Sequence, residues 1–175
     1  MRQLSMLELN RLEPEDYKKA RKVQVTVLLD NIRSAYNVGS IFRTCDAFLI
    51  EKIILTGFTP RPPHPEIRKT ALGATESVDW EYLQSPIDAL KHLKSEGYKI
   101  IAVEQTDKPT MLHEWKPEKD LKYALILGNE VKGVQGEILL LCDYAIEIPQ
   151  SGTKHSLNVA VAAGIVLWKC YEIIL

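Results

Sequence analysis

The chain has 175 residues, which is enough for one domain with a full core and too few for two ordinary domains. Hydrophobic residues make up 46% and charged residues 26%, a composition typical of a folded globular protein rather than a disordered one. The net charge of −1, from 22 basic and 23 acidic residues, excludes a protein that coats nucleic acid indiscriminately, so a nucleic-acid partner would have to meet a local basic patch.

The sequence predicts a cytoplasmic protein with no metal site. We see no secretion signal at its start, and the apolar run 159–168 is too short to cross a bilayer. No C-x-x-C pair occurs, so we expect neither a disulfide framework nor a zinc site and interpret each cysteine as a small buried hydrophobe. The four histidines lack the spacing of metal ligands. The three cysteines are Cys45, Cys142 and Cys170.

The first 22 residues predict two short helices. The sequence 5–8, Ser-Met-Leu-Glu, fits a capping box and favours a helix that continues to Leu12. A second helix opens at Pro14 with acidic residues and ends in a basic run, as the helix dipole favours. This run is a candidate phosphate-binding patch, and solvated surface charge is the alternative. It consists of Lys18, Lys19, Arg21 and Lys22.

The rest of the chain alternates between strand and helix patterns. Alternation of this kind, with apolar strands, predicts an α/β fold in which helices cover both faces of a parallel sheet. The proline-rich segment 59–65 is interpreted as an irregular loop, because core-like segments continue on both sides. Strands are predicted at 23–29, 52–56, 98–103, 123–127 and 144–148, and helices at 38–48, 85–97 and 135–141.

A further helix is predicted at 157–168, and it has almost no polar stripe. Such a helix is normally buried on all sides, but a domain of this size has little interior in which to bury it. We therefore expect the helix to pack against a second copy of the chain, giving a homodimer. The alternative is a central core helix within a monomer.

Three polar loops follow predicted strands, at the edge of a parallel sheet where ligands bind. In the first, residues 30–43, Asn37 is predicted to cap the following helix, and Gly39 permits a close approach of backbones. Arg43 lies among apolar neighbours in that helix and needs a partner. A phosphate matches the guanidinium fork, and an ion pair with Asp46 or another acid is the structural alternative.

The second loop, residues 127–134, holds Gly128 and Gly133. The two glycines resemble the start of a phosphate loop, but Val134 and Gln135 stand where that loop requires Lys and Ser or Thr. This excludes a nucleoside-triphosphate site of that type, and no G-x-G-x-x-G fingerprint for a dinucleotide occurs either. What remains is a tight loop whose backbone can approach a flat or extended ligand.

The third loop, residues 148–158, precedes the final helix. Ser156 is predicted to be its N-cap residue. Asn158 is then placed inside an otherwise apolar helix, where a buried amide has to find partners in the backbone or in a ligand.

Together, and in this order, the three loops resemble the motifs of the SpoU/TrmH branch of the SPOUT superfamily. The resemblance runs from about residue 23 to the C-terminus. It divides the chain into an N-terminal helical extension, 1–22, and a SPOUT methyltransferase domain, 23–175. The matching segments are Asn37-x-Gly-x-x-x-Arg43, Gly128-Asn129-Glu130-x-x-Gly133, and Ile148-Pro149 through Ser156-Leu157-Asn158-Val159.

The resemblance implies an RNA ribose 2′-O-methyltransferase that uses S-adenosylmethionine. It also implies that the C-terminal part forms a deep trefoil knot, which pattern reasoning does not propose because knots are almost absent from proteins. The cofactor would lie bent in the knot, its adenine held by backbone groups of the second and third loops. The cofactor-binding residues implied are Val103, Glu104, Gly128, Asn129, Gly133, Ile148, Pro149 and Leu157.

The resemblance further implies a homodimer in which Arg43 of one subunit acts near the cofactor of the other. Arg43 would serve either as the base or by binding the adjacent phosphate, and a guanidinium hardly ever loses its proton. Arg33 and the basic run before residue 23 would bind RNA. The residues that would orient Arg43, the ribose and the loops are Asn37, Glu130, Ser156 and Asn158.

The third motif departs from the common pattern, since Gln150 stands where the family often has Met after the proline. The variant is similar to a branch that includes tRNA 2′-O-guanosine methyltransferases, so we predict tRNA in preference to rRNA. The alternatives are an rRNA 2′-O-methyltransferase and a non-catalytic RNA-binding relative. A third, an α/β enzyme acting on a small molecule, would call for a cofactor fingerprint that the chain lacks.

Overall fold

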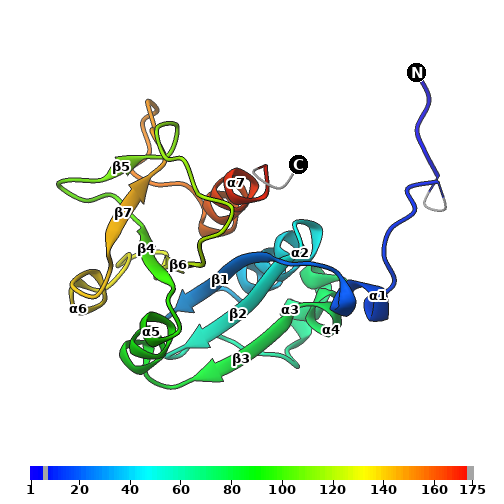
Figure 1. Cartoon of the computed structure of the whole chain (residues 1–175), viewed down its shortest axis with the longest axis horizontal. Helices are drawn as coiled ribbons and strands as arrows, with labels where there is room; N and C mark the ends of the chain where they lie inside the picture. Colours follow the sequence, from blue (N-terminus) through cyan, green and yellow to red (C-terminus); the bar gives the residue numbers. More distant parts are fainter. Residues whose placement is uncertain (6–7, 173–175) are drawn as a thin grey trace.

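The computed structural model describes residues 1–5 and 8–172, and a seven-stranded sheet forms its centre (Figure 1). The strand order is β3-β2-β1-β6-β4-β7-β5, and every neighbouring pair is parallel. The parallel sheet predicted from the alternating pattern is therefore confirmed. The strands are β1 Val23–Asp30, β2 Ile50–Thr56, β3 Asp79–Leu83, β4 Lys99–Val103, β5 Thr110–Met111, β6 Tyr123–Leu127 and β7 Tyr144–Glu147.

Helices cover both faces of this sheet, as predicted. Side chains alternate along a strand, so Val27 and Leu29 of β1 join one apolar cluster and Leu28 joins the other. Helices α2, α3, α4 and α7 contribute to the first cluster, and α5 and α6 to the second. The helices are α1 Pro14–Lys19, α2 Ala35–Ala47, α3 Pro65–Ala71, α4 Ala74–Ser77, α5 Pro86–Ser95, α6 Gly136–Leu139 and α7 Val159–Tyr171.

The elements predicted after residue 22 are present, with ends that differ by a few residues. Two strands and two short helices were not predicted: β3, β5, α3 and α4. The side chains of β3 are exposed or half-buried because it lies at the edge of the sheet, so it lacks an apolar run. β5, with two residues, is too short to show a period.

The predicted first helix is wrong for the described residues. Ser5 and Glu8 do make the contacts of a capping box, because the Ser5 N–H donates to Glu8 Oε2 at 2.9 Å. However, only a turn follows at Glu8 and Leu9, and 10–13 are not helical. Met6 and Leu7 lie outside the described residues. The second predicted helix is present as α1, although it ends at Lys19, before Arg21 and Lys22.

The two predicted helix caps are both wrong. Ser34, not Asn37, caps α2, since its hydroxyl accepts a hydrogen bond from the Asn37 N–H at 3.4 Å. Asn158, not Ser156, caps α7, because Asn158 Oδ1 lies 2.9 Å from the N–H of Ala160 and 3.3 Å from the next one. Asn158 is thus an exposed residue at the helix start and not a buried one inside it.

Helix α7 packs one face on the sheet and leaves the other exposed. Ala163 and Val166 are buried, whereas Val161, Ile165 and Trp168 are 52%, 38% and 48% exposed. The alternative of a core helix buried on all sides within one chain is therefore wrong. Figure 1 shows α7 beside α2, against which it packs. None of the helices in the described part of the chain has the length and apolar character to span a membrane.

Candidate functional site

A cavity of about 480 Å³ lies at the carboxyl edge of the sheet, where β4, β6 and β7 end. Parallel strands bring their carboxyl ends to one edge, so loops distant in sequence line the cavity together. Pro149 was predicted to bind the cofactor but is absent from the lining. The other predicted cofactor-binding residues all line it: Val103, Glu104, Gly128, Asn129, Gly133, Ile148 and Leu157.

Two glycines shape the loop after β6. Asn129 and Gly133 exchange two backbone hydrogen bonds, of 3.2 and 2.8 Å, which close the loop on itself. A Cβ at Gly128 would lie 2.4 Å from the backbone carbon of Gly133. Gly133 has a φ of 67°, and a Cβ there would lie 2.3 Å from a carboxylate oxygen of Glu104. The loop therefore requires glycine at both positions.

The carboxylate of Glu104 fastens this loop to the end of β4. It accepts hydrogen bonds from the Gln105 N–H at 2.8 Å and the Val134 N–H at 2.9 Å. Glu104 lines the cavity, and its hydrogen bonds also hold one wall of the cavity in place. Gln105 makes a second link, since its amide donates to the carbonyl of His155 at 3.0 Å.

Hydrogen bonds among side chains join all three motif loops. Glu130 accepts from the N–H groups of Arg33 and Ser34, at 2.8 and 3.1 Å, and from the Asn37 amide at 2.9 Å. Asn37 Oδ1 in turn accepts from the Asn158 amide at 3.1 Å. Asn158 was expected to need a hydrogen-bond partner, and Asn37 of the first motif is that partner. The three loops form one connected structure.

The electrostatics of Glu130 follow from these contacts. Burial raises the pKa of the Glu130 carboxyl, but hydrogen bonds from the Arg33 N–H, the Asn37 amide and the Ser34 N–H lower the pKa by more. The net pKa lies below the ordinary value for glutamate. Glu130 is thus ionised at neutral pH and accepts hydrogen bonds at the start of α2, where the helix dipole also favours negative charge.

Arg43 projects from α2 as an exposed side chain. Within residues 1–5 and 8–172 it forms no ion pair, and Asp46 instead accepts a hydrogen bond from Ser77 at 2.5 Å. The alternative of a structural ion pair with Asp46 or another acid is therefore wrong for the described residues. Arg43 does not line the cavity of its own chain, whereas Ser156 and Glu130 do.

Gly39, also on α2, permits the close approach that was predicted. A Cβ at Gly39 would lie 2.1 Å from Thr70 Oγ1 and 2.4 Å from the carbonyl oxygen of Ile67. Both residues belong to α3, so the missing side chain allows α2 and α3 to pack closely. This packing fixes the helix that carries Asn37 and Arg43.

Asn31, which was not among the predicted site residues, links two of the loops. Its φ is 54°, and its side-chain oxygen accepts from the Phe58 N–H at 3.2 Å. Its carbonyl accepts from the Asn129 amide at 2.7 Å. The sequence feature that could have indicated this role is an asparagine directly after a predicted strand. Asparagine adopts the left-handed conformation more readily than most residues.

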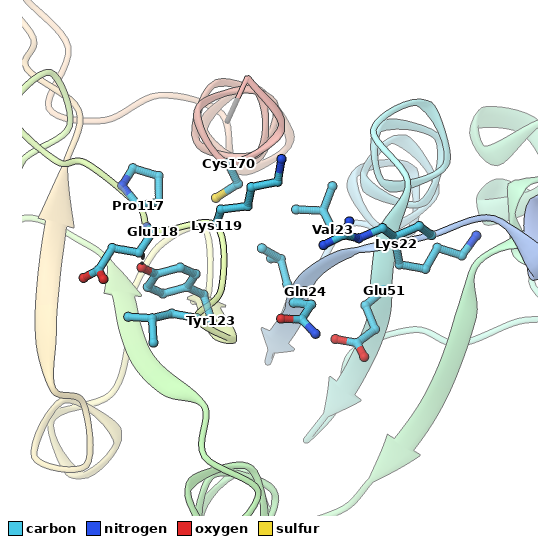
Figure 2. A pocket seen from close by; sticks show the side chains of 12 residues that line it. Lys22, Val23, Gln24, Glu51, Pro117, Glu118, Lys119, Tyr123 and Cys170 are labelled. Atoms are coloured by element: carbon cyan, nitrogen blue, oxygen red, sulfur yellow. Dashed lines mark hydrogen bonds between the residues drawn. The ribbon is translucent and has the colours of Figure 1, made fainter. Parts of the chain in front are cut away.

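A second, smaller cavity of about 220 Å³ lies at the opposite edge of the sheet (Figure 2). It opens between the starts of β1 and β6 and the end of α7, with Gln24, Tyr123 and Cys170 in its lining. Charges of both signs surround it, and the Glu118 N–H donates to the Tyr123 hydroxyl at 2.8 Å. It brings none of the motif residues together. The lining charges are Arg21, Lys22, Glu51, Glu118 and Lys119.

The basic run predicted to bind RNA lies near this amino edge. Lys18, Lys19 and Arg21 are exposed. Lys22 folds back, with its ammonium 3.0 Å from the centroid of the Tyr17 ring and hydrogen-bonded to the Tyr17 carbonyl. The structure therefore separates the run from the carboxyl-edge cavity and gives Lys22 a partner within the chain.

Comparison with known proteins identifies the family. A sequence profile described as the SpoU rRNA Methylase family matches residues 24–168. The chain is also 33% identical over 165 residues to the tRNA (guanosine(18)-2′-O)-methyltransferase of Thermus thermophilus, covering 93% of this chain and 81% of that protein. It belongs to the SpoU/TrmH family. The family consists of S-adenosylmethionine-dependent RNA 2′-O-methyltransferases, so the resemblance stated from the motifs is confirmed.

Solved SpoU/TrmH structures share this fold. The A. aeolicus TrmH/SpoU tRNA modifying enzyme superposes with a TM-score of 0.79 at 28% identity, covering 91% of this chain and 79% of that one. An rRNA methyltransferase from Sinorhizobium meliloti with bound AdoMet superposes with a TM-score of 0.81 at 26% identity, covering 91% and 60%. The predicted cofactor, S-adenosylmethionine, is thus that of the family.

Proposed function

We propose that this SpoU/TrmH protein transfers a methyl group from S-adenosylmethionine to a ribose 2′-oxygen of tRNA. The observation that carries the proposal is the chain of contacts from Asn158 through Asn37 to Glu130, beside the carboxyl-edge cavity. The Thermus relative, named as a tRNA enzyme, supports tRNA because the match covers 81% of its length, against 60% of the Sinorhizobium rRNA enzyme.

The residues at the cavity fit the cofactor. A volume of about 480 Å³ lies in the range of small-molecule sites. The missing side chains at Gly128 and Gly133 let backbone approach a ligand closely, and Ile148 and Leu157 supply apolar surface on the other wall. S-adenosylmethionine supplies the methyl group on a sulfonium, and these four residues would hold it.

Arg43 would bind a phosphate of the substrate RNA next to the target ribose. Its guanidinium is exposed, charged and without an ion-pair partner in the described part of the chain, so it is available to an external anion. The ribose hydroxyl has to lose its proton as it attacks, and alignment lowers the barrier. Glu130 and Asn37 would hold the start of the Arg43 helix in place, while Ser156 and Asn158 would orient the opposite loop.

We also propose a homodimer that forms through α7. The exposed apolar face of α7 continues into an aromatic cluster, with ring centroids 5.7 Å apart between Phe48 and Trp168 and 5.3 Å apart between Phe48 and Tyr171. α7 also packs beside the Arg43 helix. Because Arg43 does not line the cavity of its own chain, we propose that it acts at the cavity of the partner.

The remaining proposals concern the ends of the chain. Residues 1–22 would form an extension that contacts RNA through Lys18, Lys19 and Arg21, with Arg33 near the site.

The segment that leads into α7 would thread a loop to form the trefoil knot. The sheet order supports this, because β6 lies between β1 and β4 and β7 lies between β4 and β5. An experimental electron-density map traced through 104–122 and 148–158 would test the threading.

The first experiment measures transfer of labelled methyl from S-adenosylmethionine into tRNA and, separately, into rRNA, both from cells that lack this protein. We expect a 2′-O-methylnucleoside in the tRNA fraction. Arg43→Ala should abolish the transfer without changing cofactor affinity, and Lys91→Ala, which removes an exposed cation of α5, should change neither. Label in rRNA alone would contradict the tRNA assignment, and cofactor binding with no transfer to either RNA would contradict the activity.

A mixing experiment tests the composite site. Arg43→Ala and Gly128→Ala are each expected to be inactive, one for lack of the arginine and the other for lack of cofactor binding. If Arg43 acts across the dimer, a refolded equal mixture recovers roughly a quarter of wild-type activity, because half of the dimers are mixed and each has one complete site. An inactive mixture in which mixed dimers are demonstrated would contradict the proposal.

A further inference from the structure

Phe58 stands exposed at the carboxyl edge of the sheet, on a backbone that is firmly held. The residue is 63% exposed although it lies only two positions after Thr56, the buried end of β2. The Phe58 N–H donates to Asn31 Oδ1 at 3.2 Å, and the Tyr82 hydroxyl donates to the carbonyl of Gly57 at 2.9 Å. Gly57 has a φ of 60°, and a Cβ there would lie 2.2 Å from Asn31 Oδ1. These contacts with Asn31 and Tyr82 therefore fix the backbone that carries the exposed ring.

The same contacts tie Phe58 to the candidate site. The adjacent Thr59 hydroxyl accepts from the Ile32 N–H at 3.0 Å and donates to the carbonyl of Leu29 at 3.0 Å. The carbonyl of Asn31 accepts from the Asn129 amide, which belongs to the loop that lines the cofactor cavity. Phe58 is thus anchored to the loops after β1 and β6, on the side of the sheet away from β7.

Basic residues lie close to Phe58 in the sequence, and Arg61 and Arg33 lie next to Tyr82 and Asn31, the residues that hold its backbone. Residues 57–70 contain three basic residues and one acidic residue, Glu66, although the whole chain has a net charge of −1. The Arg61 guanidinium stacks over the Tyr82 ring at 4.3 Å from its centroid, and Arg33, just beyond Asn31, is exposed. The three basic residues are Arg61, Arg68 and Lys69.

We propose that Phe58 is a stacking platform for an unpaired base of the RNA substrate, and so a residue that positions substrate. This inference rests on the proposed RNA methyltransferase function. Every base presents a flat face that an aromatic ring can stack on, and neighbouring cations meet the phosphates on either side. A single exposed hydrophobe needs no explanation in general, but this one is held by specific contacts next to the site. The excess of cations over acidic residues favours RNA over a protein partner, because Lys and Arg side chains neutralise the phosphates of a nucleic acid.

The test compares substitutions at Phe58 by steady-state methyl transfer to tRNA. Phe58→Ala should raise the KM for tRNA roughly 5- to 150-fold, the range measured for loss of one stacked base, and leave the KM for S-adenosylmethionine unchanged. Phe58→Trp should keep the wild-type KM for tRNA. Phe58→Leu should raise this KM as much as Phe58→Ala does, because leucine is apolar but has no aromatic face. Leu140→Ala, at an exposed hydrophobe after α6, should have no effect.

A direct binding assay separates this inference from the proposed function. The probes are a fluorescent 12-nucleotide single-stranded RNA and the matching 12-base-pair duplex. Phe58→Ala should weaken binding of the single strand and leave binding of the duplex unchanged. Equal affinity of wild type and Phe58→Ala for the single strand would overturn the inference, and so would wild-type affinity of Phe58→Leu. A sedimentation coefficient of Phe58→Ala that differs from that of wild type would also overturn it, because Phe58 would then contribute to assembly of the protein. Absence of methyl transfer by the wild type would instead overturn the proposed function, since probe binding requires no transfer.

Discussion

The two edges of the sheet differ in kind, although each has a cavity. At the carboxyl edge, three loops are joined by side-chain hydrogen bonds, and two glycines let backbone segments approach within distances that a Cβ would not allow. At the amino edge, the cavity in Figure 2 is lined by charges of both signs and none of its residues belongs to a motif. Convergent polar contacts, and not the presence of a hollow, distinguish the edge where we place the chemistry.

Gly128→Ala should have the largest effect on the carboxyl edge. The new Cβ would lie 2.4 Å from backbone atoms of both Gly133 and Val134. Relieving the clash requires a shift of the backbone at two positions, which is energetically unfavourable. Overpacking of this kind costs about 3 kcal/mol at its upper end, so we expect roughly 100-fold weaker binding of S-adenosylmethionine by calorimetry. Gly136→Ala is the matched control, because nothing lies within 4 Å of its Cβ. Normal cofactor affinity in Gly128→Ala would contradict the assigned cavity.

Asn37→Ala should have the next largest effect, on turnover rather than on cofactor binding. The substitution removes the link between the motif loops, leaving Glu130 with two backbone donors and the Asn158 amide without its acceptor. Loss of about 1.4 kcal/mol of positioning corresponds to a roughly tenfold lower kcat. Gln24→Ala, at the amino edge, is the control and should keep the wild-type kcat. An equal loss in both variants would remove the distinction between the edges.

Glu130 should also make the stability of the carboxyl edge dependent on pH. Its folded-state pKa is lower than in the unfolded chain, so its contribution to stability is complete above the ordinary value of 4.5 and is lost as the pH falls through the folded-state pKa. Urea unfolding midpoints measured from neutral to acidic pH should fall less steeply in Glu130→Gln than in wild type. Glu118→Gln, at the amino edge, should follow the wild-type curve. Identical curves for wild type and Glu130→Gln would contradict the role of the hydrogen bonds.

The sequence predicts the carboxyl edge better than it predicts the contacts there. Apolar runs identify β1, β2, β4, β6 and β7, and the glycines identify the loops, because both are local features of the chain. The link from Glu130 to the N–H of Arg33 spans 97 residues, and the link from Asn158 to Asn37 spans 121. No local pattern predicts such a pairing.

The two incorrect caps have the same cause. Asn37 and Ser156 each lie within three residues of another side chain that can cap, and the sequence does not show which of the two is used. Asn37 is engaged with Glu130, so Ser34 caps α2 in its place. The edge strands β3 and β5 were missed for a different reason, since a strand with half-exposed side chains, or with two residues, has no apolar period to detect.

The smallest predicted effects belong to the amino edge, at the basic run. Lys19→Ala removes an exposed cation and should weaken tRNA binding slightly, lowering the slope of log affinity against log salt by about 1 if Lys19 meets a phosphate. Lys22→Ala should leave that slope unchanged, because Lys22 stacks on Tyr17. It should instead lower the free energy of unfolding by about 0.5–1 kcal/mol.

Fluorescence anisotropy of labelled tRNA over a salt series gives both slopes, and urea unfolding gives the stability difference. If Lys19→Ala leaves the slope unchanged, the amino edge does not bind RNA and the extension is ordinary solvated surface. If Lys22→Ala alone lowers the slope, Lys22 exchanges Tyr17 for a phosphate in the complex, and the stacked arrangement belongs to the free protein. In both cases methyl transfer at saturating tRNA should persist, because the amino edge would contribute affinity and not alignment of the reacting groups.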